Sequence, residues 1–115
     1  MSEQTYQEVS TVIARDLIGL YRLGIKNLNK INLKEFKGEY HDYFYYRKNK
    51  HPKIYERLTF DTNGFTPYSE DLGSIMDDFV VCGFVEPGKI IHFENVETIK
   101  GYFKWIDERL KKTTQ

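Results

Sequence analysis

Residues 65–72 read Phe-Thr-Pro-Tyr-Ser-Glu-Asp-Leu, and this stretch places a turn, a helix cap and the start of an apolar helix in direct succession. Ser69 is a suitable N-cap because its side-chain oxygen can accept a backbone N–H of the first helical turn. Glu70 and Asp71 follow at positions where the helix dipole favours negative charge. We therefore predict a helix from Ser69 to Cys82 whose buried stripe is Leu72, Ile75, Met76, Phe79 and Val80.

The residues after this helix predict a small β-hairpin. Gly83 ends the helix, because glycine readily adopts the left-handed conformation that closes many helices. The two arms are predicted at residues 84–86 and 89–93, and Pro87-Gly88 occupies the central positions that a type II turn prefers. Two-residue hairpin loops usually use mirror-image turns instead. We therefore expect a slightly longer, irregular tip.

Apolar residues at steps of three and four predict a first helix over residues 5–23 and a last helix over about residues 96–111. Leu23-Gly24 ends the first helix, and Asn95 caps the last. Both helices have wide apolar faces, so we expect them to pack together or to form a homodimer interface. The apolar positions of the last helix are Val96, Ile99, Phe103, Ile106 and Leu110, flanked by Tyr102 and Trp105.

A second helix is predicted from about Leu33 to Arg47. Asn32 and Glu35 have the form of a capping box, in which the two side chains satisfy backbone donors reciprocally. Gly38 falls in the middle of this helix, where it costs about 1 kcal/mol relative to alanine. It either permits a close approach by another element or weakens the helix.

The segments on either side of this helix have weaker patterns. Residues 25–31 predict a linker or one short helical turn, anchored by Leu28 and Ile31. Residues 54–60 fit either a short helical piece or a strand. We favour a short strand that joins the later hairpin, because Asp-Thr-Asn-Gly at 61–64 is a strong turn signal.

The predicted order is helix, helix, a short strand or helical piece, helix, hairpin, helix, which indicates a mainly helical α+β fold with one domain over residues 1–115. Residues 58–93 resemble small prokaryotic winged-helix proteins, including regulators and antitoxin-like domains. These often carry Gly-Pro-Tyr-Ser, an acidic residue and leucine, then a helix ending in Gly, an apolar pair and the wing. Thr66 stands where that pattern usually has Gly. The resemblance implies a winged-helix-like architecture more than an activity, and its matching positions are Pro67, Tyr68, Ser69, Leu72, Gly83, Phe84 and Val85.

The single cysteine, Cys82, excludes an intramolecular disulfide and a Cys-based zinc site, which fits a reducing compartment. The longest uncharged runs are too short to span a membrane. The first residues are too polar for a signal peptide. We therefore expect a cytoplasmic protein without a membrane partner.

The formal net charge is zero, but the charges are divided unevenly along the chain. Residues 25–57 carry nine Lys or Arg against four Asp or Glu, and residues 58–99 carry one Lys against eight acidic residues. If this division persists in the folded protein, one face suits an anionic partner and the other face repels one. The alternative is that both regions are solvated faces.

The helix at 69–82 argues against the usual use of a winged helix, in which the helix before the wing enters the major groove of DNA. It has no Lys or Arg, whereas helices that read base edges depend on Arg, Lys, Asn and Gln. DNA binding would therefore use the basic segment 26–57. Its candidate contacts are Lys26, Lys30, Lys34, Lys37, Arg47, Lys48, Lys50 and Lys53.

Four consecutive aromatic residues, 43–46, precede a basic turn at 47–53. Aromatic rings beside cations are what single-stranded nucleic acid binding needs. Four consecutive residues on a helix point in all directions, however, so at most two share a face. We favour a helix that is buried on one side, with tyrosine hydroxyl groups reaching water on the other.

The sequence has little that indicates catalysis. His41, His51 and His92 are far apart, and no second histidine stands at a metal-ligand spacing from any of them. There is no glycine-rich phosphate loop. A cluster of Glu35, Glu39 and His41 is the one catalytic alternative that the sequence leaves open. We predict no enzymatic activity, no cofactor and no metal.

Two functions follow from these patterns. The first is a small regulatory or protein-interaction module on a winged-helix-like scaffold, whose predicted protein contacts are Glu70, Asp71, Asp77, Asp78 and Trp105. The second is a DNA-binding transcriptional regulator that contacts DNA through the basic segment 26–57.

Overall fold

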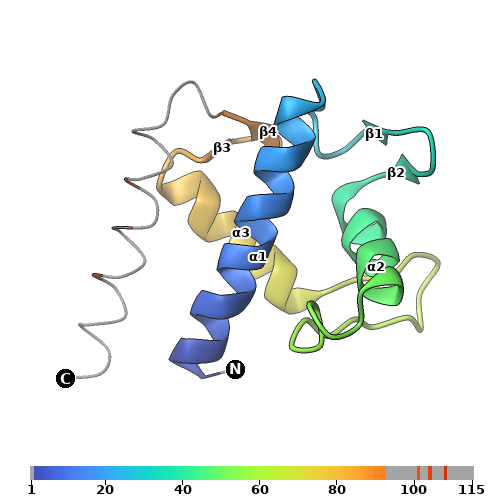
Figure 1. The fold of residues 1–115 in the computed structure, drawn as a ribbon, viewed down its shortest axis with the longest axis horizontal. Coiled ribbons are helices and arrows are strands. Elements are labelled where there is room, and N and C mark those ends of the chain that lie inside the picture. The colour runs from blue at the N-terminus through green and yellow to red at the C-terminus, as the bar shows by residue number, and fades with distance from the viewer. Residues whose placement is uncertain (1, 93–100, 102–103, 105–107, 109–115) are drawn as a thin grey trace.

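The computed structural model describes residues 2–92 together with Gly101, Lys104 and Glu108 (Figure 1). This part of the chain folds into three helices and two small antiparallel hairpins, so the predicted α+β class is confirmed. The helices are α1 (Glu3–Arg22), α2 (Tyr40–Lys50) and α3 (Glu70–Val81). The hairpins are β1 (Ile31–Asn32) with β2 (Lys37–Gly38), and β3 (Val85–Glu86) with β4 (Ile90–Ile91).

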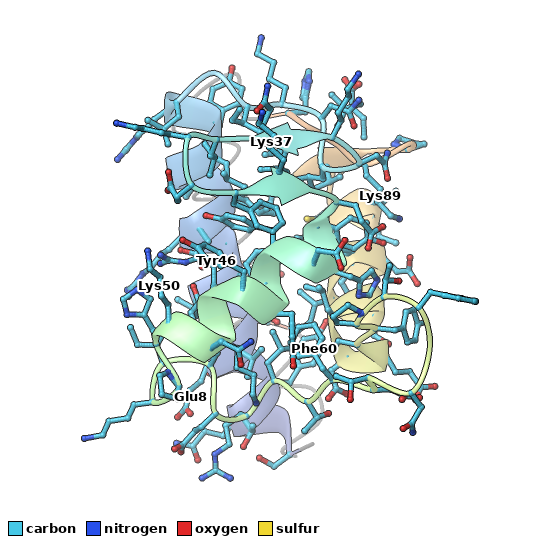
Figure 2. The ribbon with its side chains drawn as sticks, turned by 90° about the vertical axis from the view of Figure 1, so that its right-hand side faces the viewer. Glu8, Lys37, Tyr46, Lys50, Phe60 and Lys89 are labelled. Atoms are coloured by element: carbon cyan, nitrogen blue, oxygen red, sulfur yellow. The ribbon has the colours of Figure 1, made fainter. Side chains whose placement is uncertain are left out.

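Helix α1 runs through the middle of the molecule, and α2 lies to one side of α1 and α3 (Figures 1 and 2). The predicted first helix is confirmed, with its end at Gly24 in the left-handed conformation, φ 84°. Its stripe packs into one core with apolar residues of α2, α3 and the β3–β4 hairpin. The largest fully buried side chains of this core are Phe44, Phe79, Phe84, Ile13, Leu17, Leu20, Leu28, Ile31, Leu58, Leu72, Ile75 and Met76.

Helix α3 begins where the sequence predicted. The Ser69 hydroxyl oxygen accepts the backbone N–H of Leu72 at 3.1 Å, which satisfies one of the unpaired donors of the first turn. Gly83 follows the helix with φ 82° and allows the chain to reverse. Of the five predicted stripe residues, Val80 is half-buried, and the fully buried ones are Leu72, Ile75, Met76 and Phe79.

The β3–β4 hairpin has the longer tip that turn geometry predicted. Glu86 pairs with Ile90, so three residues form the loop. Gly88 has φ 93°, and the backbone N–H of Lys89 donates to the carbonyl of Glu86 at 3.0 Å. Phe93, the last residue of the predicted second arm, lies outside the described residues.

The segment that leaves α1 pairs with the second strand of this hairpin. Asn27 bridges Ile90, the N–H of Leu28 donates to the carbonyl of Lys89 at 2.8 Å, and the N–H of Ile91 donates to the carbonyl of Lys26 at 2.8 Å. Strand β4 therefore lies between β3 and residues 26–28. The predicted linker is confirmed over residues 25–30, and Ile31 begins β1; Leu28 and Ile31 are buried as the predicted anchors. The pairing with β4 was not predicted.

The second predicted helix is wrong over its first half. Residues 31–38 form the β1–β2 hairpin, and the N–H of Leu33 donates to the carbonyl of Phe36 at 2.7 Å to close its turn. Asn32 is therefore a strand residue and caps no helix. The hairpin keeps Gly38 out of a helix interior, where it would be unfavourable. A Cβ atom at Gly38 would lie 3.0 Å from the Phe36 ring, so this glycine permits a close approach.

The strand predicted at residues 54–60 is also wrong, because residues 52–57 form consecutive turns. Tyr55 and Leu58 are nevertheless buried and hold this segment against the core. The Lys48 ammonium group donates to the carbonyls of both residues. The backbone carbonyls of Tyr55 and Leu58 are therefore hydrogen-bonded although this segment is not part of a β-sheet.

The predicted last helix, with its cap Asn95, lies outside the described residues apart from Gly101, Lys104 and Glu108. Its packing on the first helix, the role of Trp105 and the homodimer through the two helices therefore stay predictions. Within the described part of the chain, no helix has both the length and the apolarity that a bilayer crossing requires.

Replacing Ser69 by alanine tests the importance of the α3 cap. We expect Ser69→Ala to lower the free energy of unfolding by about 1 kcal/mol, because the N–H of Leu72 loses its partner. Urea unfolding followed by circular dichroism measures this change. Ser74→Ala, at an exposed position of the same helix, is the control and should shift stability by less than about 0.5 kcal/mol. Equal stability of Ser69→Ala and the wild type would contradict the assignment.

Candidate protein-interaction surface

The loop of residues 61–68 is closed at its base by a pair of backbone hydrogen bonds. The N–H of Asp61 donates to the carbonyl of Tyr68 at 2.7 Å, and the N–H of Tyr68 donates to the carbonyl of Asp61 at 2.9 Å. The Asp61 carboxylate also accepts the N–H of Asn63 at 2.9 Å, which shapes the turn. Phe65, within this loop, has a fully exposed side chain. The loop therefore presents an aromatic ring to solvent on a fixed base.

A cleft of about 420 Å³ lies at the base of this loop and the start of α3, and it is lined by Thr59, Phe60, Asp61, Tyr68 and Glu70. Phe60 lies between α2 and α3 in Figure 2, and its ring meets the edge of the Tyr45 ring with 5.4 Å between centroids. The cleft therefore combines two aromatic rings with two carboxylates. Among the residues that the structure describes, no Lys or Arg lines the cleft.

His41 lies beneath the aromatic side of this surface. Its ring stacks on the Tyr68 ring, with centroids 4.8 Å apart and an interplanar angle of 26°. Its Nδ1 atom accepts the backbone N–H of Ser69 at 3.1 Å, so Nδ1 carries no proton. Burial lowers the pKa of His41, while the Asp42 carboxylate raises it and the Lys89 ammonium group lowers it. A neutral imidazole therefore joins α2 to the cap of α3.

The four predicted acidic contacts on α3 are not equally placed. Glu70 and Asp77 are exposed, and Asp77 lies 4.0 Å from the Lys89 ammonium group. Asp71 is half-buried and accepts the Thr59 hydroxyl at 3.1 Å. Asp78 is also half-buried. Only Glu70 lines the cleft, and Trp105 lies outside the described residues.

The basic segment does not form one surface. Arg47 contacts Asp16 at 3.4 Å and the Tyr55 hydroxyl at 3.3 Å, and Lys48 caps backbone carbonyls, so both side chains have internal partners. Lys50 and Lys53 are exposed at the C-terminal end of α2 and just beyond it, and Lys50 lies 5.2 Å from the Tyr46 ring centroid. The remaining four are exposed on and near the β1–β2 hairpin: Lys26, Lys30, Lys34 and Lys37. Figure 2 shows Lys37 and Lys50 at well-separated places on the molecule.

The aromatic run at 43–46 is distributed around α2, as its helical spacing predicted. Tyr43 and Phe44 are buried. Tyr45 packs on Phe60, and Tyr46 stacks on Phe36 with centroids 5.3 Å apart. The interpretation as a helix buried on one side is confirmed, and these four rings do not form a common platform for bases.

The three residues of the catalytic alternative lie at different places: Glu35 between β1 and β2, Glu39 at the N-cap of α2, and His41 within α2. The Nδ1 atom of His41 is occupied by the Ser69 N–H, and Glu35 is exposed in the β1–β2 turn. Burial raises the pKa of Glu39, with a further contribution from Asp42. Among the described residues, no three His, Cys, Asp or Glu side chains are arranged to hold a metal ion.

Sequence reasoning missed the residues that form the cleft, apart from Glu70. Asp61 belongs to the predicted turn at 61–64, and Tyr68 belongs to the predicted helix start and to the winged-helix resemblance. One signal was present: an aromatic residue next to the Asp-Thr-Asn-Gly turn has no periodic element in which to bury its ring. Phe60, on the other side of this turn, falls in the segment 54–60 that favours a strand, so the sequence does not mark it as a cleft residue.

Comparisons of the chain with models of protein families, with curated proteins and with solved structures each found no match.

The His41 contact predicts a pH dependence of stability. Because the folded-state pKa of His41 lies below the ordinary value of 6.5, the unfolded chain binds more protons than the folded protein at mildly acidic pH. The stability from this contact is complete above pH 6.5 and is lost as the pH falls. We expect the wild type to lose on the order of 1 kcal/mol, the value of one hydrogen bond, between about pH 7.5 and pH 5.

Urea unfolding at the two pH values measures this loss, and variants assign it. His41→Asn, which keeps an acceptor but does not titrate there, should lose less stability on acidification than the wild type. His51→Asn, at an exposed position, should keep the wild-type pH dependence. If His41→Asn and the wild type respond equally to pH, His41 is not the group responsible.

Proposed function

We propose that the protein is a small, non-enzymatic protein-interaction module that binds a basic segment of a partner protein at the cleft between the 61–68 loop and α3. The observation that carries this proposal is the combination of exposed Phe65 and half-exposed Tyr68 with the carboxylates of Asp61 and Glu70. Exposed aromatic residues beside uncompensated charge are typical of contact surfaces.

A winged-helix-like scaffold is part of the proposal. Helix α3 leads directly into the β3–β4 hairpin, whose second strand lies between β3 and the segment leaving α1. These features support the scaffold. The connection from α2 to α3, residues 51–69, is much longer than the turn of three or four residues in a DNA-binding helix-turn-helix. We therefore propose the scaffold without a recognition helix that enters the major groove of DNA.

The charges of α3 favour a basic partner over DNA. A carboxylate about 4 Å from a phosphate costs about 1 kcal/mol in bulk water and about 4 kcal/mol near a protein surface. Glu70 is exposed at the start of this helix beside the Asp61 carboxylate, and α3 has no Lys or Arg that would compensate these charges. The same charges attract Lys and Arg and speed the encounter with a basic segment.

Affinity selection from a random peptide library tests the proposal. We expect the immobilised protein to enrich peptides that combine Lys or Arg with apolar residues. Phe65→Ser should weaken their binding about tenfold or more, the loss typical of an aromatic anchor. Leu23→Ser, which alters an exposed apolar residue at the C-terminal end of α1, is the matched control and should bind as the wild type does. Enriched peptides that bind Phe65→Ser and the wild type equally would refute this surface.

The second candidate function is binding of DNA through the β1–β2 hairpin. Exposure of all four lysines on and near that hairpin favours it, whereas Arg47 and Lys48 have internal partners. An electrophoretic shift assay with duplex DNA at low salt decides it. We expect no shift at tens of micromolar protein, where nonspecific DNA binders are already bound. A shift that Lys34→Ala/Lys37→Ala abolishes, and that Lys50→Ala/Lys53→Ala leaves unchanged, would establish DNA binding at the hairpin instead.

A further inference from the structure

We propose that the cleft is an arginine-binding subsite, in which a guanidinium group of the partner segment stacks on Tyr68 and binds the carboxylates of Asp61 and Glu70. This inference rests on the proposed function and names the side chain that the cleft recognises. The side chains that line the cleft are two aromatic rings, two carboxylates and one threonine.

The backbone pairing of Asp61 with Tyr68 sets the relative position of carboxylate and ring. The two residues exchange both backbone hydrogen bonds, at 2.7 and 2.9 Å. Residues paired in this way direct their side chains to the same side of the ribbon, with Cβ atoms about 5 Å apart. A planar cation lying on the Tyr68 ring is therefore within reach of the Asp61 carboxylate.

The Tyr68 ring has one supported face and ample free surface. One face stacks on His41, while 53% of the residue is exposed to solvent. His41 is held neutral because its Nδ1 accepts the Ser69 N–H, so the stack places no positive charge beneath the ring. The π-face of a tyrosine attracts a cation within about 6 Å.

The carboxylates of the cleft have unused acceptor capacity. Asp61 binds the N–H of Asn63 through Oδ1, and its Oδ2 makes no hydrogen bond within the described part of the chain. The Glu70 side chain makes neither a hydrogen bond nor an ion pair with another described residue. The N-terminus of α3 contributes roughly half a positive charge, which the two carboxylates outweigh. Arg57 lines the neighbouring cleft, and its Nε atom lies 3.5 Å from Oε1 of Glu56, so this cation pairs with Glu56.

Arginine fits this arrangement better than lysine. Its guanidinium group is planar, stacks on aromatic faces and binds carboxylates through two parallel N–H donors, whereas the lysine ammonium group is a strongly hydrated point charge. Phe65, on the same loop, adds an apolar contact for residues that flank the arginine. We therefore expect an arginine next to apolar residues in a partner peptide.

Nuclear magnetic resonance titration of the isotope-labelled full chain tests this site. The probes are three tripeptide amides, N-acetyl-Leu-X-Leu-amide, in which X is arginine, lysine or citrulline. Citrulline keeps the shape of arginine but lacks its charge. We expect the arginine peptide to shift the amide signals of Asp61, Tyr68 and Glu70 at millimolar concentration. The citrulline peptide should bind about tenfold more weakly, because its hydrogen bonds are no longer charge-assisted, and the lysine peptide should fall between them.

Variants place the interaction within the cleft. Asp61→Asn and Glu70→Gln should each weaken the arginine peptide several-fold. Asp77→Asn makes the same change of net charge on α3 but outside the cleft, so it should leave the affinity unchanged. Equal affinity for the arginine and citrulline peptides, equal losses in all three variants, or no shift at the cleft would each overturn the subsite.

These outcomes separate the subsite from the proposed function. If library peptides bind through Phe65 while the arginine and citrulline tripeptides bind equally, the interaction surface stands and the arginine subsite fails. If selected peptides are indifferent to Phe65→Ser while the arginine tripeptide still shifts the cleft signals, the surface is smaller than proposed and the subsite stands. Absence of both effects would refute both proposals.

Discussion

The structure depends on the buried start of α3. Ser69 is only 1% exposed, so its polar groups need partners within the protein. Its hydroxyl oxygen accepts the N–H of Leu72, and its own N–H donates to Nδ1 of His41 on α2. The first bond starts α3, and the second fixes α3 against α2. Because leaving such groups unpaired costs about 1–3 kcal/mol each, both hydrogen bonds favour this arrangement of the two helices.

The same contact shapes the proposed binding surface. Tyr68 immediately precedes Ser69, so the cap that fixes α3 also fixes the base of the 61–68 loop. The ring of Tyr68 rests on the imidazole whose nitrogen serves the cap. The loop is thus held at its base, while Phe65 remains exposed on the loop itself. A rigid base with an exposed aromatic ring lowers the entropic cost of binding a partner.

The sequence predicted the parts of the fold whose signals are local. Ser69 and Gly83 mark the two ends of α3, and the sequence predicts both because capping and left-handed closure need only a few neighbouring residues. The β1–β2 hairpin was missed because its pattern competes with a capping box at Asn32. The hairpin prevails through contacts that are distant along the chain or specific to the turn: burial of Ile31 in the core and the close fit of Gly38 to the Phe36 ring. Secondary-structure propensity includes neither of these two contacts.

The sequence by itself determined the start and end of α3, the longer tip of the β3–β4 hairpin and the acidic character of α3, because each depends on neighbouring residues or on composition. Only the tertiary structure decided which charges reach solvent. It paired Arg47 with Asp16 and turned Lys48 toward backbone carbonyls, which divides a basic segment that is continuous in sequence. It also brought Asp61 beside Tyr68 and both to Glu70. The physical reason is that burial and pairing depend on contacts between residues far apart in the chain, which periodicity does not encode.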